Sequence, residues 1–153
     1  YLAFVRHAHD AVRDLCIGTD VLVGTPGETD DDFAETCALI EEGPIAYAHV
    51  FKYSERRGTA SVRLDGKVDE ATKRRRSARL RRLSGEKRRR FQEARLGSAY
   101  DVLFESREDG WWSGYTGNYV RVAARSADRL ENELRSVRLE RICGDFVVGE
   151  LAS

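Results

Sequence analysis

The stretch VLVGTPGETDDDF, residues 21–33, predicts the end of a buried strand, a glycine turn and the start of a helix. Its first three residues are apolar and mostly β-branched, which is typical of a strand covered on both faces. Pro26 and Gly27 suit a tight turn, and Thr29 is placed to cap a helix with an acidic first turn. Because ligands of α/β folds bind at the carboxyl ends of parallel strands, this turn is a candidate ligand site. The alternative is that the Pro-Gly pair serves only to make the turn.

The segments around this stretch repeat the same pattern. Residues 1 to about 14 predict an amphipathic helix, residues 17–24 a strand, residues 29–42 a helix and residues 45–51 a second short apolar strand. This alternation favours an α/β fold with a parallel sheet. Four elements are too few to close a barrel or to complete a doubly wound sheet. We therefore expect the chain to be part of a longer protein.

Charge is balanced over the 153 residues but strongly segregated along them. Residues 28–42 contain seven acids and no Lys or Arg, whereas residues 73–90 contain eleven Lys or Arg and one acid. Residues 69–96 predict one long helix, with Ser84-Gly85 as the place for a bend. Its apolar stripe of Leu80, Leu83, Phe91 and Ala94 is too narrow to form a core. Its basic faces favour RNA or DNA as a partner over a merely solvated surface.

The polar loop at residues 52–67 follows the second predicted strand. It holds Tyr53, Ser54, Arg56 and Arg57, an aromatic ring, a hydroxyl and two guanidinium groups that can grip an anion or a base. A solvated loop without a ligand is the equally weighted alternative.

After Gly97 the hydrophobic period changes from helical to alternating. Five short strands are predicted, at residues 99–106, 111–116, 118–124, 134–142 and 145–151. Five antiparallel strands in so short a segment suggest a small barrel, an architecture that often binds nucleic acid. Trp111, Trp112, Tyr115 and Tyr119 can offer stacking faces beside Arg121, although at least half of these rings should fill the core.

Cysteine content and hydropathy exclude several classes of protein. Cys16, Cys37 and Cys143 fit neither a disulfide framework nor a CxxC metal pattern, so we expect buried thiols in a reducing compartment. No apolar stretch reaches the roughly 20 residues of a membrane span, and no signal peptide is visible. We expect a cytoplasmic protein without a membrane partner.

Four motifs in this order resemble the C-terminal half of the tRNA methylthiotransferases, which are radical S-adenosylmethionine enzymes. They are VGTPGET with its acidic helix start, HVFKYSERRGT at 49–59, the basic helix ending at Leu96-Gly97, and GYTGNYVRV at 114–122. The HVF form and the Asn-Tyr pair are most similar to the branch that modifies N6-threonylcarbamoyladenosine beside the anticodon. The family commonly has Phe at Thr25 and Pro at Lys52 and Ala60, so the pocket shape differs here.

The resemblance implies a fold of α/β followed by all-β. Residues 1–67 would be the C-terminal part of a parallel radical S-adenosylmethionine barrel, residues 68–96 a basic connecting helix, and residues 97–152 a five-stranded antiparallel TRAM-like RNA-binding barrel. The partners implied are the tRNA anticodon stem-loop and the missing N-terminal part of the same protein.

The family's chemistry uses S-adenosylmethionine and two [4Fe-4S] clusters. One cluster, on a CxxxCxxC loop, generates a radical that abstracts hydrogen from C2 of the adenine, and the second delivers sulfur that is then methylated. The three cysteines of this chain do not match those ligands, so by resemblance the fragment alone is inactive, with no catalytic or metal residue of its own.

The resemblance also assigns site residues. The adenosyl group would contact a set from the two strand ends: Leu22, Gly24, Glu28, Val50 and Phe51. The RNA would contact a second set from the loop, the helix and the barrel: Arg56, Arg57, Arg74, Arg75, Arg76, Arg88, Arg89, Arg90, Tyr115, Asn118, Tyr119 and Arg121. The rival hypothesis is a non-catalytic RNA-binding adaptor that carries a TRAM-like module.

Overall fold

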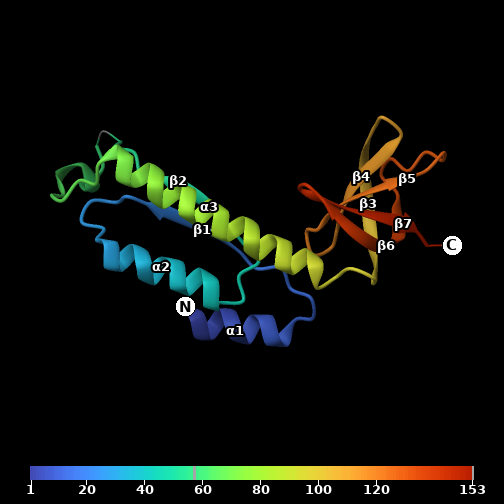
Figure 1. Ribbon diagram of the computed structural model, residues 1–153, viewed down its shortest axis with the longest axis horizontal. Helices are drawn as coiled ribbons and strands as arrows, with labels where there is room; N and C mark the ends of the chain where they lie inside the picture. The colour runs from blue at the N-terminus through green and yellow to red at the C-terminus, as the bar shows by residue number, and fades with distance from the viewer. Residues whose placement is uncertain (57, 153) are drawn as a thin grey trace. The chain divides into compact units, whose positions relative to one another are not determined.

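Helices alternate with strands in the first part of the chain, and strands make up the rest (Figure 1). The computed structural model describes residues 1–56 and 58–152. The elements are α1 (Leu2–Ala11), β1 (Gly18–Val23), α2 (Asp30–Glu42), β2 (Tyr47–Lys52), the 3-10 helix η1 (Ala60–Arg63), α3 (Glu70–Glu93), β3 (Ala99–Glu108), β4 (Trp111–Thr116), β5 (Arg121–Arg125), β6 (Leu134–Cys143) and β7 (Phe146–Leu151). Contacts divide the chain into two units, Tyr1–Arg88 and Arg89–Ser153, with the boundary inside α3.

The first unit contains a two-stranded parallel sheet, as the alternating pattern predicted. β1 and β2 pair in register from Gly18 and Tyr47 to Val23 and Lys52. One face packs Val23, Ala48 and Val50 against residues of α2 and α3. The other face is not covered among the described residues, and the aligned pair Leu22 and Phe51 is about half exposed there. Within the described residues, β1 and β2 are therefore covered on one face only, whereas the sequence predicted cover on both.

The outer edge of β2 is closed by α3. Ala48 donates its backbone N–H to the Ser84 hydroxyl at 2.8 Å, and the same hydroxyl donates to the Ala48 carbonyl at 2.9 Å. One strand residue directs both groups to the same edge, so Ser84 occupies the place of a further strand residue. Arg81 reaches the Val50 carbonyl at 3.4 Å on this edge. The sheet can therefore extend only beyond β1.

The buried face of α3 is wider than its apolar stripe. Leu80 and Leu83 belong to the core of the first unit, which corrects the prediction that they could not form one. Their stripe is widened by polar side chains that are also buried: Lys73, Arg76, Ser77 and Ser84. Long basic side chains can cover apolar surface with their methylene groups, a contribution that hydropathy alone misses.

The second unit is a mixed five-stranded sheet that closes on itself in the order β3-β4-β5-β7-β6 (Figure 1). β5 and β7 pair in parallel, and the other neighbours pair antiparallel. The prediction of a purely antiparallel sheet is wrong, because strands cannot alternate direction around a closed ring of odd number. Its interior is apolar and includes Phe104, Val122, Val137 and Leu139.

The cysteines differ in burial. Cys37 is buried in α2, and burial raises the pKa of its thiol. Cys16 is half-buried and Cys143 is exposed, so the prediction of buried thiols holds only for Cys37. Over residues 1–56 and 58–152, none of the helices combines the length and apolar character needed to span a bilayer.

Candidate functional site

A pocket of about 490 Å³ opens where β1 and β2 end. Its walls come from the two strand ends and the following loop: Leu22, Phe51, Lys52, Tyr53, Ser54, Arg56, Thr59 and Ser61. Because Leu22 and Phe51 are aligned neighbours on the uncovered sheet face, they form one apolar wall. The pocket lies at the carboxyl edge of a parallel sheet, where α/β folds bind ligands.

The rest of the pocket is polar. The Thr59 hydroxyl donates to the Arg56 carbonyl at 2.8 Å and lies 2.9 Å from the Ser61 hydroxyl. Arg56 is exposed in this loop. The Tyr53 hydroxyl is buried and has no hydrogen-bond partner among the described residues. An apolar wall facing hydroxyls and a guanidinium suits a ligand with both a flat apolar group and polar or anionic groups.

The turn after β1 is held from α3. Gly24 has a φ of 75°, and a Cβ built on it would lie 2.3 Å from Cγ of Lys73. Both the backbone conformation and the nearby Lys73 side chain therefore favour glycine at this position. The Lys73 ammonium in turn lies 5.5 Å from the centre of the Tyr53 ring, so α3 supports both the turn and a pocket residue.

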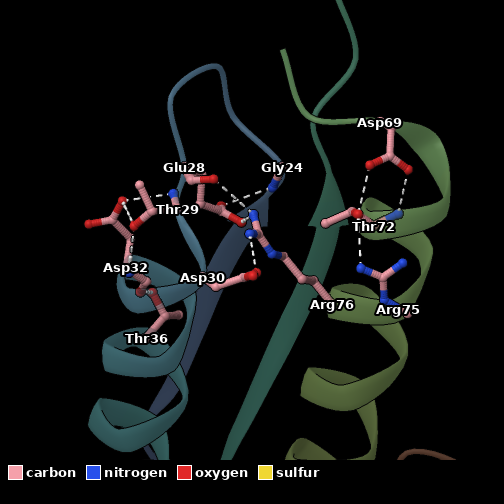
Figure 2. A network of polar contacts seen from close by, with 10 residues as sticks. All are labelled: Gly24, Glu28, Thr29, Asp30, Asp32, Thr36, Asp69, Thr72, Arg75 and Arg76. Atoms are coloured by element: carbon pink, nitrogen blue, oxygen red, sulfur yellow. Dashed lines mark hydrogen bonds and ion pairs between the residues drawn. The ribbon is translucent and has the colours of Figure 1, made fainter. Parts of the chain in front are cut away.

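Glu28 is the centre of a polar network that joins this turn to α3 (Figure 2). One carboxylate oxygen accepts the backbone N–H of Gly24 at 2.9 Å, and the other accepts from the Arg76 guanidinium. Arg76 also donates to Asp30 at 2.7 Å. Burial alone would lower the pKa of Arg76, but the hydrogen bonds to Asp30 and Glu28, with their charges, raise it above its ordinary value.

Both helices of this network begin with side-chain caps (Figure 2). Thr29 and Asp32 form a reciprocal capping box at the start of α2, and the hydrogen bonds from Thr29 lower the pKa of Asp32. Asp69 accepts from the Thr72 backbone at 2.9 Å and from its hydroxyl at 2.7 Å at the start of α3. The sequence predicted the first cap.

The structure separates the residues predicted to contact the cofactor. Leu22 and Phe51 line the pocket. Val50 packs into the helix-covered core, so its side chain lies on the opposite sheet face. Gly24 and Glu28 shape the turn, and Glu28 uses both carboxylate oxygens within the protein.

The predicted RNA contacts on α3 are mostly exposed. The exposed arginines of this helix are Arg74, Arg75, Arg79, Arg81, Arg82, Arg88, Arg89 and Arg90. Arg76 is the exception: its side chain is 7% exposed and is paired with Glu28 and Asp30, so it faces the protein. Arg57, also predicted to contact RNA, lies outside the described residues.

On the closed sheet, Tyr115 and Tyr119 are exposed, with ring centres 6.4 Å apart. Arg121 is exposed and aligned with Tyr115 across β4 and β5. Asn118 accepts a hydrogen bond from the Thr116 hydroxyl at 2.6 Å. Trp112 is buried and Trp111 half-buried, so the tryptophans contribute more to packing than the tyrosines do.

Two known proteins that are similar in sequence to this chain carry the same name. Over 99% of its length it is 33% identical to the tRNA-2-methylthio-N(6)-dimethylallyladenosine synthase of Symbiobacterium thermophilum, of which it covers 33%. Over 69% of its length it is 41% identical to the protein of the same name from Bartonella bacilliformis, of which it covers 23%.

A third relative carries a different substrate name. Over 84% of its length the chain is 31% identical to the threonylcarbamoyladenosine tRNA methylthiotransferase MtaB of Bacillus subtilis, of which it covers 30%. No family model matches the chain. The chain spans a third or less of the length of these relatives. Along most of its length the chain is therefore similar in sequence to about a third of these tRNA-modifying proteins.

Proposed function

We propose that this chain is the C-terminal segment of a radical S-adenosylmethionine tRNA methylthiotransferase, with residues 1–67 as the end of the radical barrel. The observation that carries the proposal is the pocket, because Leu22 and Phe51, assigned to the adenosyl group by resemblance, line one cavity. One face of the β1-β2 sheet packs on helices, and Leu22 and Phe51 are exposed on the other face. Both features agree with a sheet that continues beyond β1 in a longer protein.

The pocket has the chemistry that S-adenosylmethionine needs. Leu22 and Phe51 would pack on the adenine ring, while Ser54 and Arg56 would bind polar groups. When bound, S-adenosylmethionine supplies the radical and the methyl group of the reaction. In residues 1–56 and 58–152, no three His, Cys, Asp or Glu side chains are grouped to hold a metal. The two [4Fe-4S] clusters would be held by other parts of the protein.

The exposed arginines of α3 would bind the tRNA phosphate backbone. They include both predicted triplets except Arg76, and guanidinium groups pair well with phosphates. The closed sheet would act as the TRAM-like domain, with Tyr115, Tyr119 and Arg121 on its RNA-facing side.

We further propose N6-threonylcarbamoyladenosine in the anticodon stem-loop as the substrate. This choice rests on the residues His49 to Phe51 and on the Asn118-Tyr119 pair, which are similar to that branch of the family. The relatives carry both substrate names, so the comparisons support the reaction class rather than this base.

The decisive experiment expresses the full-length coding sequence in a host that lacks its own tRNA methylthiotransferases. Mass spectrometry of tRNA nucleosides then identifies the product. We expect the methylthio form of threonylcarbamoyladenosine; the dimethylallyl product would replace the substrate assignment. RNA binding without any methylthio product would favour the adaptor hypothesis.

Two sets of variants separate the two roles. Leu22→Glu and Phe51→Glu should abolish product formation while the protein still binds the stem-loop. Replacing Arg88, Arg89 and Arg90 by Gln should weaken stem-loop binding and lower the slope of log affinity against log salt by about 2 to 3. Binding that is weak and insensitive to salt in the unmodified protein would contradict the phosphate contacts.

A further inference from the structure

One row of side chains crosses the outer face of the closed sheet in register. Leu134 of β6 is aligned with Leu103 of β3, Leu103 with Tyr115 of β4, and Tyr115 with Arg121 of β5. The three apolar members are 63%, 44% and 40% exposed, in that order. We call this set, together with Tyr119, the outer row.

An apolar outer row is unusual for a sheet whose other face already forms the core. Solvent-facing positions of such sheets are normally polar, because only the inner face needs to be buried. Here the neighbouring outward positions follow that rule: Asp101 and Ser136 flank the row on one side, and Ser113 flanks it on the other. With about 4.8 Å between strands, the row is about 14 Å long and one residue wide.

The end of the row lies in a hydrogen-bonded turn. Tyr119 is 76% exposed and has a φ of 62°, a conformation that non-glycine residues rarely adopt. The Thr116 hydroxyl fixes the turn, because it accepts the Val120 backbone N–H at 2.9 Å and donates to Asn118 at 2.6 Å. The Tyr119 N–H donates to the Thr116 carbonyl at 3.0 Å. Asn118, predicted to touch RNA, is therefore placed to position Tyr119.

We infer that the outer row is a stacking site for unpaired nucleobases of RNA, and this inference rests on the proposed tRNA substrate. The Tyr115 and Tyr119 rings, with planes tilted by 55° to each other, and the Arg121 guanidinium offer separate faces on which bases can stack. A protein partner would need about 800 Å² on this surface, whereas the row is a single file bordered by polar positions. Asp101 disfavours phosphates beside Leu103, so the phosphates lie on the Arg121 side.

The inference adds Leu103 and Leu134 to the RNA-binding surface. It also means that this surface contacts the bases of the RNA rather than its phosphates. Neither leucine stands out in the sequence, because only the strand register places them beside Tyr115. Their predicted role is to extend the apolar surface beside the bases that stack on the tyrosines.

The test compares two single-stranded RNA probes of equal length, one with bases and one abasic, binding to the whole chain. Fluorescence anisotropy should show the base-bearing probe binding about tenfold more tightly. Tyr119→Ala and Leu103→Ser should each remove most of that preference without changing affinity for the abasic probe. Tyr119→Phe should retain it, and Leu64→Ser, an exposed leucine of the first unit, is the matched control.

The positioning role of Thr116 has its own readout. Thr116→Val keeps the side-chain size but removes the hydroxyl, so it should reduce the preference for bases while circular dichroism stays unchanged. A preference unaffected by Thr116→Val would remove the turn from the inference.

Equal affinity for the two probes would overturn the outer row as a base site and leave the phosphate contacts of α3 intact. A concentration-dependent dimer in sedimentation that Leu103→Ser abolishes would also overturn it, because the row would then be covered by a second copy. Failure of both probes to bind would overturn the inference and the proposed function together. If only the variants of Arg88, Arg89 and Arg90 lost binding, the proposed function would be supported and the base site overturned.

Discussion

The two sheets of this chain leave different surfaces for ligands. The β1-β2 sheet packs one face on helices and leaves Leu22 and Phe51 uncovered on the other, beside the pocket. The five-stranded sheet of the second unit closes around its own core, so its interior is filled by side chains such as Phe104. An open sheet can therefore bind a ligand at its strand ends, whereas a small closed sheet has only its outer face and loops.

Both cores are apolar clusters, and buried polar side chains occur in both units. In the first unit, buried Arg76 is paired with the carboxylates of Glu28 and Asp30. In the second unit, buried Arg95 donates to the Phe91 carbonyl at 2.6 Å. The first unit should therefore be sensitive to loss of its ion pair.

The largest expected loss of stability comes from removing a large core side chain, and it should be confined to the unit that contains that side chain. Phe104→Ala should destabilise the second unit by about 4 kcal/mol, and Leu80→Ala the first by about 3 kcal/mol, because both side chains are fully buried. Hydrogen exchange measured by mass spectrometry would show faster exchange in β3–β7 for the first variant and in β1, α2 and β2 for the second. Equal acceleration in both units by either variant would contradict two separate cores.

Breaking the Glu28–Arg76 pair should affect only the first unit. Arg76→Met leaves Glu28, whose side chain is 12% exposed, without its cation and should cost about 3 kcal/mol in chemical denaturation. The exposed Arg75→Met is the control. The double variant Glu28→Gln, Arg76→Met should recover part of the loss, because no charge is then left unpaired. If Arg76 instead contacted RNA, Arg76→Met would lower RNA affinity without changing stability.

The order of elements was predictable because its signals are local. Alternating apolar runs, the Pro26-Gly27 turn and the Thr29 cap placed strands and helices within a few residues of their observed ends. The direction of β7 beside β5 was not predictable in this way. It follows from closing a ring of five strands, which no local pattern encodes.

The candidate site was predicted only in part, because burial depends on the phase of each helix and strand. Arg74, Arg75 and Arg76 look alike in the sequence, yet only Arg76 lies on the α3 face that carries Leu80 and Leu83. Its spacing of four residues from Leu80 was the available signal.

Register limits the prediction in the same way. Leu22 and Phe51 were identified from motifs and do line one pocket. Val50, one residue earlier on its strand, points to the other face, because strand side chains alternate. The contribution of Leu103 depends on pairing between distant strands, so its own sequence context carries no sign of it.

The third prediction concerns the edge of the open sheet, which the closed sheet does not have. Ser84→Ala removes both hydrogen bonds to Ala48 and leaves a buried N–H and carbonyl unpaired, at a cost of about 2 kcal/mol. Ser77, equally buried on α3, provides the matched control Ser77→Ala. The Ala48 amide should exchange faster only in Ser84→Ala, and equal exchange in the two variants would show that α3 does not close this edge.

The fourth prediction tests the support of the ligand turn by α3. Gly24→Ala and Gly27→Ala both place alanine at a positive φ, but only the Cβ at position 24 meets Lys73. Gly24→Ala should therefore cost about 1 kcal/mol more than Gly27→Ala. Thermal denaturation gives the difference, and equal losses would mean that Lys73 moves aside without cost.

The smallest effect is an acid transition at the start of α3. The side-chain and backbone hydrogen bonds from Thr72 lower the pKa of Asp69 below its ordinary value of 3.8. A carboxyl whose folded pKa is depressed stabilises the folded state above its ordinary pKa, and the stabilisation is lost as pH falls through the folded value. Amide protection at Thr72, corrected for intrinsic exchange, should therefore decrease as pH falls below the ordinary Asp value of 3.8.

The closed sheet supplies the internal reference for this acid transition, because the Leu139 amide donates to the Ser98 carbonyl at 2.9 Å within the second unit. Asp69→Asn keeps a capping side chain that does not titrate. The ratio of amide protection at Thr72 to amide protection at Leu139 should then be the same at every pH. If the decrease persisted in Asp69→Asn, another group would control the start of α3. If the decrease vanished in Asp69→Asn, the charge of Asp69 would be shown to stabilise the start of α3, the helix that carries the exposed arginines.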